Sequence, residues 1–268
     1  MDIGRIKKIV DYSSNHKAEI VTDIQRFYAL GGIDINSDFL NLLQIARRIL
    51  FDKGYLVFEL PFADDEIGAM CYKGDGIGYV VLNTSLPVIN YNFALAHEIY
   101  HVLFQQDYHM TNIEFAAENY YEHDEEFAAN LFAGMIVMPE NGFIRMFNKY
   151  KAESQDSIRD VFIKLMAYYK APYMAVVIRS IELELCGWKQ LSKGILDYSK
   201  DQIRDRMFEL WLDVSVLDAS FRDDTRRIEM MIREYGQAYI SEGFLSDHVL
   251  DNVISNFQAL SSKIKGES

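Results

Sequence analysis

Cysteine is scarce in this chain, which has only Cys71 and Cys186 among 268 residues. The two lie far apart and form no Cys-x-x-Cys pair, so the sequence argues against a disulfide framework and against cysteine-ligated zinc. We expect both thiols to be free and buried in a reducing compartment.

Long hydrophobic runs are also missing. No stretch approaches the roughly 20 consecutive apolar residues of a membrane-spanning helix. The first residues, Met1–Lys8, lack the apolar core of a signal peptide. We therefore expect a cytoplasmic protein with no membrane partner. Hydrophobic residues still make up 50% of the chain, which is enough for one large core or for two domains.

Basic residues are outnumbered: 27 Lys and Arg stand against 40 Asp and Glu, for a net charge of −13. Proteins that bind nucleic acid normally present a basic patch, so we expect no direct nucleic-acid contact. An acidic protein suits a basic partner, and a DNA-binding regulator is one such partner.

The most informative segment present is Asn92–Phe104, which contains the pattern His-Glu-x-x-His at residues 97–101. Its only strongly polar residues after Asn92 are the two histidines and the glutamate, as is typical of a helix buried nearly all round. Buried imidazoles and carboxylates need a partner. Because residues four apart share a helix face, His97 and His101 can bind one divalent metal ion. Glu98 can then act as a general base on a water at that ion.

The pattern around this segment predicts an α+β fold. Three strands, at Tyr55–Leu60, Ile67–Tyr72 and Ile77–Asn83, are expected to form a small, mostly antiparallel sheet before the metal helix. Asn90 or Asn92 can cap that helix. The other expected helices lie around residues 20–27, ending at Gly31-Gly32; at 38–53, capped by Ser37; at 125–138, capped by Asp124; at 152–170; at 173–185; and over much of 190–268.

A catalytic zinc site needs a third protein ligand and one position left for water. A third histidine in the pattern His-Glu-x-x-His-x-x-Gly-x-x-His is excluded, because Phe104 and Asp107 stand where that pattern has glycine and histidine. The remaining route is a side chain on a following segment. The candidates are Glu118, Glu122, Glu125, Glu126, His109 and His123.

Glu126 is favoured by its surroundings. It starts an otherwise apolar helix, and Asn130, one turn on, lies on the same face and is the only polar residue in that run. Ala129 and Ala133 would let this helix pack closely on the metal helix. A carboxylate at a helix start is also stabilised by the helix dipole without any metal, and spacing alone leaves the other candidates open.

Two of these segments together resemble the ImmA/IrrE family of metallopeptidases. Phe93–His101 is similar to the family's metal helix, and Glu126–Ala133, continuing to Val137-Met138-Pro139, is similar to its second site helix. The preceding helix and strands, residues 38–83, also match. The resemblance covers about residues 38–140, and more loosely extends to about 190. It departs at Gly134 and Val137, where Ala and Leu are usual.

The resemblance implies a zincin-like core and a zinc metalloendopeptidase. It assigns His97, His101 and Glu126 as the ligands of Zn²⁺, which lowers the pKa of its bound water to about 7. Glu98 would take the proton from that water and pass it to the leaving amine. Possible oxyanion donors, among which the spacing selects none, are Tyr120, Tyr121 and His123.

The resemblance also implies a partner. Members of the family typically cleave a helix-turn-helix repressor, which induces mobile-element, phage or stress genes, so the expected substrate is a DNA-binding repressor and the expected role is that of an anti-repressor. An extended substrate can add to an exposed sheet edge, and the hairpin around Gly74-Asp75-Gly76 could offer one.

We expect four parts along the chain: an N-terminal helical extension at 1–37, the zincin-like metallopeptidase core at 38–150, a helical hairpin at 151–190 and a C-terminal helical extension at 191–268.

Two other functions compete with proteolysis. One is a metal-binding module that sequesters a repressor without cutting it; Glu98 argues against this, because metal ligation does not require it. The other is DNA binding through residues 158–185, which are expected to form helix, break and helix. The second of these helices carries one arginine, Arg179, and an acidic pair after it, whereas a recognition helix presents several basic or amide side chains.

Overall fold

The computed structural model describes residues 3–32, 42–74, 77–105, 124–153, 157–191 and 193–267. The fold is α+β, with many helices and one small sheet, as the sequence predicts. The division into four parts stays a prediction.

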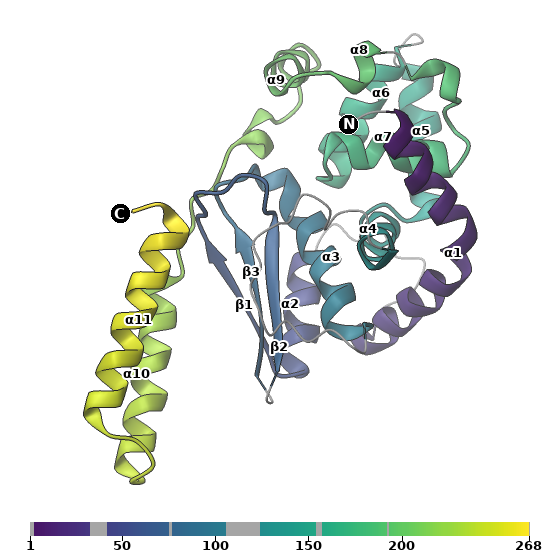
Figure 1. Ribbon diagram of the computed structural model, residues 1–268. Helices are drawn as coiled ribbons and strands as arrows, with labels where there is room; N and C mark the ends of the chain where they lie inside the picture. Colours follow the sequence, from purple (N-terminus) through teal and green to yellow (C-terminus); the bar gives the residue numbers. More distant parts are fainter. Residues whose placement is uncertain are drawn as a thin grey trace.

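The helices cover both faces of the sheet (Figure 1). On one face lie α2 (Leu42–Asp52) and α3 (Tyr91–Leu103), and on the other lies the hairpin of α10 (Thr225–Ser241) and α11 (Asp247–Lys265). Beyond α3, the helix α4 (Asp124–Val137) packs against it, and α1 (Ile3–Gly31) packs against α4 in turn. The helix α3 is therefore enclosed between the sheet and α4.

The sheet contains β1 (Tyr55–Leu60), β2 (Ala69–Gly74) and β3 (Ile77–Asn83), in the order β1-β3-β2. The strands β2 and β3 pair antiparallel, whereas β1 and β3 pair parallel. The prediction of a mostly antiparallel sheet is therefore wrong for one of the two pairs, and the sheet is mixed.

The parallel pair arises because the connection after β1 crosses the end of the sheet before β2 begins. Asn83, the last residue of β3 and almost fully buried, holds this connection. Its Oδ1 accepts a hydrogen bond from the Phe62 amide (3.1 Å), and its Nδ2 donates to the carbonyls of Asp64 (2.9 Å) and Ile67 (2.8 Å). The strand β2 is thus placed at the outer edge and β3 returns between its neighbours. A hydrophobic pattern identifies strands, but it does not choose their neighbours.

The helix α3 confirms the predicted buried helix. Its apolar side chains Leu95, Ala96, Ile99 and Val102 are all buried, because one face meets the sheet and the other meets α4. The prediction that an asparagine side chain caps it is wrong. Asn90 stands at the N-cap, but the chain enters α3 through the 3₁₀ turn η1 (Val88–Asn90), and the Asn90 side chain makes no capping hydrogen bond.

The helix α1 is longer than the sequence predicts. The pattern indicated a helix only around residues 20–27, yet α1 runs for 29 residues. Its buried residues recur at helical spacing along the whole length, including Ile6, Ser13, Ile20, Ile24 and Phe27. Long polar stretches between them hide this stripe from a short sequence window. The predicted cap Ser37 lies outside the described residues.

The helix α5 (Glu140–Glu153), which begins directly after Pro139, is not among the predicted helices. Proline also suits a helix start, where a missing N–H costs nothing. Here its carbonyl accepts the first hydrogen bond of α5, from the amide of Phe143 at 2.8 Å. Asp124, predicted as a cap, is instead the first residue of α4.

The helices α6 (Ile158–Tyr169) and α7 (Tyr173–Glu182) follow the predicted helix, break and helix, and they meet at 109°. Arg179 on α7, the one basic residue of the suggested recognition helix, is only 2% exposed and pairs with Glu182 at 3.1 Å. A buried and paired arginine is not available to a base edge, which argues against DNA recognition by α7.

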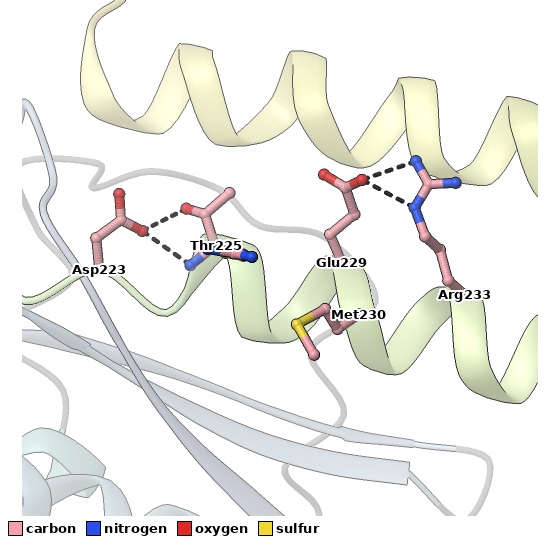
Figure 2. A pocket seen from close by; sticks show the side chains of 6 residues that line it. Asp223, Thr225, Glu229, Met230 and Arg233 are labelled. Atoms are coloured by element: carbon pink, nitrogen blue, oxygen red, sulfur yellow. Dashed lines mark hydrogen bonds and ion pairs between the residues drawn. The ribbon is translucent and has the colours of Figure 1, made fainter.

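The C-terminal region contains the predicted helices: α8 (Lys193–Leu196), α9 (Lys200–Glu209), α10 and α11. Ile228, Met231 and Ile264 at the base of the α10–α11 hairpin pack on the second face of the sheet. Within α10, Glu229 accepts a hydrogen bond from Arg233 at 2.7 Å (Figure 2), and it also accepts one from Gln258 of α11 at 3.1 Å. Both cysteines are buried and they do not form a disulfide with each other, as predicted.

Among the described helices, none alone combines the length and apolar character needed to cross a membrane. Two bent pairs, α4 with α5 and α6 with α7, meet that test together by length and composition.

An ion pair joins α6 to α9 and gives a test of the fold. Asp160, buried in the first turn of α6, accepts from Arg206 Nε at 2.8 Å and from its Nη2 at 2.6 Å. These bonds hold the pKa of Asp160 below its ordinary value of 3.8. Because the folded-state pKa is lowered, the stabilisation is complete above the unfolded-state pKa and disappears as the pH falls through the folded-state value.

We expect Asp160→Asn to lower the free energy of unfolding by about 1–2 kcal/mol at pH 7, and we expect the difference from wild type to shrink below about pH 4. Urea titrations across this pH range measure it. Asp201→Asn, at an exposed position in α9, is the control. A difference that does not change with pH would contradict the assignment.

Candidate metal centre

The packing of α3 on α4 brings His97, His101 and Glu126 together. The Nε2 atoms of the two histidines lie 3.1 Å apart. Glu126 Oε2 lies 3.2 Å from His97 Nε2, and its Oε1 lies 3.4 Å from His101 Nε2. The ligand atoms of all three residues lie within 4.8 Å of one another. The two histidines predicted from their spacing and the glutamate implied by the family resemblance therefore lie together as one cluster.

Two amide side chains orient the histidine rings. His97 Nδ1 bonds to Asn130 Oδ1 at 3.1 Å, and His101 Nδ1 bonds to Gln105 Oε1 at 2.6 Å. An amide oxygen accepts only, so each Nδ1 carries the proton and donates it. In the neutral imidazoles this leaves both Nε2 lone pairs directed toward the carboxylate of Glu126. Three acceptors that converge in this way need a cation or a proton between them.

The pKa values of His101 and Glu126 are both shifted by the groups around them. Burial alone would lower the pKa of His101, but the Glu126 hydrogen bond and the nearby charges of Glu98 and Glu126 raise it above its ordinary value. Burial would raise the pKa of Glu126, but the hydrogen bonds and charges of His101 and His97 lower it to about 2. Glu126 is thus ionised at neutral pH, as a metal ligand must be.

The donor set fits zinc. Two histidine nitrogens and one carboxylate form a common catalytic zinc set that leaves a fourth position open. With bonds of about 2.0–2.1 Å in a tetrahedral arrangement, ligand atoms lie about 3.3 Å apart. The distances of 3.1, 3.2 and 3.4 Å already match this spacing. The amide partners of both Nδ1 atoms are the kind of outer support that metal-binding histidines usually have.

Glu98 also lies close to this centre. It is 7% exposed, and after the Glu126 hydrogen bond its charge is one of the contributions that raise the pKa of His101. A buried carboxylate beside the two histidines, and not needed to complete the three-residue donor set, is available to handle a proton.

Of the candidates for the third ligand, the structure describes Glu125 and Glu126 and separates these two. Glu126 is buried in the cluster, while its neighbour Glu125 is exposed at the start of α4. The other candidates and the suggested oxyanion donors lie outside the described residues: Glu118, Glu122, His109, His123, Tyr120 and Tyr121.

Sequence reasoning missed two supporting residues. Gln105 lies four residues after His101 and just beyond the end of α3, so helical spacing could have found it. Lys73 on β2 donates to the Val102 carbonyl at 3.2 Å, near the C-terminus of α3, where a cation is favourable. No local sequence signal connects Lys73 to α3, because the sheet topology brings them together.

Comparisons with known proteins agree with this geometry. Residues 52–180 match the Peptidase_M78 family model, described as an IrrE N-terminal-like domain. The matched segment contains α3 and α4, and so all of the cluster residues. No curated protein matches the chain.

The assignment of the third ligand is testable by elemental analysis of purified protein. We expect about one zinc per chain in the wild type and a near-complete loss in Glu126→Gln, because two histidines alone bind zinc weakly. Glu125→Gln changes the adjacent exposed residue and is expected to retain the metal. Equal zinc content in the two variants would show that Glu126 is not a ligand.

The support from Asn130 is testable by competition with a zinc chelator. We expect Asn130→Ala to weaken zinc binding about 10- to 100-fold, because His97 loses the acceptor that fixes its ring and tautomer. Asn130→Asp keeps an acceptor oxygen and is expected to bind zinc at least as tightly as wild type. An affinity that is unchanged in Asn130→Ala would rule out this role.

Proposed function

We propose that this chain is a zinc-dependent endopeptidase with a zincin-like core. The first support is that residues 52–180 match the model of the Peptidase_M78 family, described as an IrrE N-terminal-like domain, whose members are zinc-dependent metallopeptidases. The observation that carries the proposal is the convergence of His97, His101 and Glu126 in the packed interface of α3 and α4.

These three residues would hold the ion, and Asn130 and Gln105 would keep both Nε2 atoms directed at it. When bound, Zn²⁺ supplies Lewis acidity toward the scissile carbonyl and lowers the pKa of a water molecule. Glu98 accepts the proton of the attacking water and then delivers it to the leaving amine. Its burial supports this role, because a carboxylate shielded from solvent exchanges its proton with the reacting groups rather than with bulk water.

The sheet offers a place for the substrate backbone. The strand β2 lies at one edge of the sheet and packs beside α3. An extended peptide can add to such an edge through main-chain hydrogen bonds, which act on any sequence. The peptide would then run alongside the helix that carries His97 and His101.

We propose a helix-turn-helix repressor as the substrate, so that cleavage induces mobile-element, phage or stress genes. The support is the resemblance to the ImmA/IrrE family and the net charge of −13, which suits a basic DNA-binding partner.

The variant Glu98→Gln distinguishes proteolysis of the repressor from simple sequestration of it. We expect this variant to keep its zinc, because Glu98 is outside the donor set, and to lose cleavage by at least 10³-fold, because the general base is gone. The assay is co-expression with repressors encoded nearby, followed by mass spectrometry of the fragments. Zinc content measured on the same samples controls for loss of the site. Induction that survives in Glu98→Gln would support sequestration instead.

A further inference from the structure

A small cavity of about 210 Å³ lies beside the metal centre, between α1, α3, α4 and α7. Its walls are mainly apolar. The side chains that matter for its character are Phe93 from α3, Phe127 and Leu131 from α4, and Ile178 from α7.

The cavity shares a wall with the metal centre. Asn130, which accepts the hydrogen bond from His97, lines it. Phe93 lies one helical turn before His97, and Phe127 directly follows Glu126. None of the cluster residues lines the cavity itself, so Asn130 is the side chain that connects the cavity to the metal centre.

Gly134 keeps this cavity wide. It lies inside α4, where glycine is the least favourable residue apart from proline. A Cβ built on Gly134 would meet nothing within 4 Å, and its backbone does not have a positive φ. Neither close packing nor backbone conformation requires glycine there. Because Gly134 lines the cavity, the lack of a side chain at this position leaves the cavity larger than any other residue would.

The charged residues at the cavity favour an uncharged occupant. Arg179 and Glu182 neutralise each other at 3.1 Å, and Arg179 also donates to the Met138 carbonyl at 3.3 Å. The third charged residue of the lining, Arg5, is exposed to solvent on α1 and has an interaction partner of its own. A charged group placed here would lose its hydration and would have to compete with a pair that is already satisfied.

We propose that this cavity is a specificity pocket that takes one large apolar or aromatic side chain of the protein substrate, next to the bond that is cut, and that Gly134 sets its size. The volume supports this occupant: about 150 Å³ is enough for a benzene ring, whereas free ligands usually occupy about 300–1,000 Å³. The inference rests on the proposed peptidase function.

The first test measures binding without requiring proteolysis. In the full chain loaded with zinc, N-acetyl-phenylalaninamide at millimolar concentration should shift the methyl NMR signals of Met174, Ala175 and Ile178. N-acetyl-glycinamide should not shift them. Absence of these shifts with the phenylalanine probe would overturn the pocket, whatever the protein cleaves.

Variants then test the role of pocket size. Gly134→Ala should raise the melting temperature by a few degrees and weaken the phenylalanine probe. Gly134→Leu should abolish probe binding, and Ala175→Leu fills the same space from α7 if the first variant fails to fold. Ala152→Leu, exposed on α5 and away from the cavity, is the matched control and should bind the probe like wild type.

The last test reads specificity from a peptide mixture cleaved by the same proteins. We expect large apolar residues beside the cut bond for wild type and for Ala152→Leu, and a shift of at least tenfold toward small residues for Gly134→Leu. An unchanged preference would overturn the proposal. If wild type binds the probe but cuts no peptide and no repressor, the peptidase function fails; if it cuts but does not bind the probe, only the pocket fails.

Discussion

The site depends on one constraint: the lone pairs of two histidine nitrogens and the charge of one carboxylate must be compensated inside the closely packed interface of α3 and α4. α3 and α4 press two Nε2 atoms and one carboxylate to within hydrogen-bond distance of one another, in a region with little access to water. Such a group of acceptors is costly in the core unless a positive charge lies among them. The fold therefore contains a place for a cation before any ligand is considered.

Much of the remaining structure serves to hold this interface. Alanines at positions 96, 129 and 133 are fully buried and let the helices approach closely. The sheet supports α3 from behind, and Lys73 ties β2 to its last turn. On the other side, α1 lies along α4, with Tyr12 in contact with Phe127 at a ring distance of 5.5 Å. The long N-terminal helix, all of which precedes the matched family segment, is thus part of the support of the site.

The sequence predicted those features that depend on local spacing. The helix of His97 and His101 and the strands Tyr55–Leu60 and Ile77–Asn83 were all predicted within a residue or so, because each has its own period of apolar side chains. Glu126 was favoured because a carboxylate in an otherwise apolar helix is costly to bury unless a partner compensates its charge. Features that depend on the order in which the strands pair could not be predicted from the sequence pattern. The parallel pairing of β1 with β3 follows from bonds made by Asn83, and the link from Lys73 to α3 follows from that pairing. The helix α5 was not predicted because a proline such as Pro139 is equally compatible with the end of one helix and the start of the next.

Asn130 belongs to both the metal centre and the cavity, and this has a thermodynamic consequence. Any molecule that presses on this amide also changes the hold on the His97 ring, so occupancy of the cavity and retention of the ion are linked equilibria. Linkage is reciprocal: by whatever factor a bound side chain tightens the ion, the ion tightens that side chain. In a protein built this way, the supply of metal would affect recognition of the polypeptide as well as the chemistry.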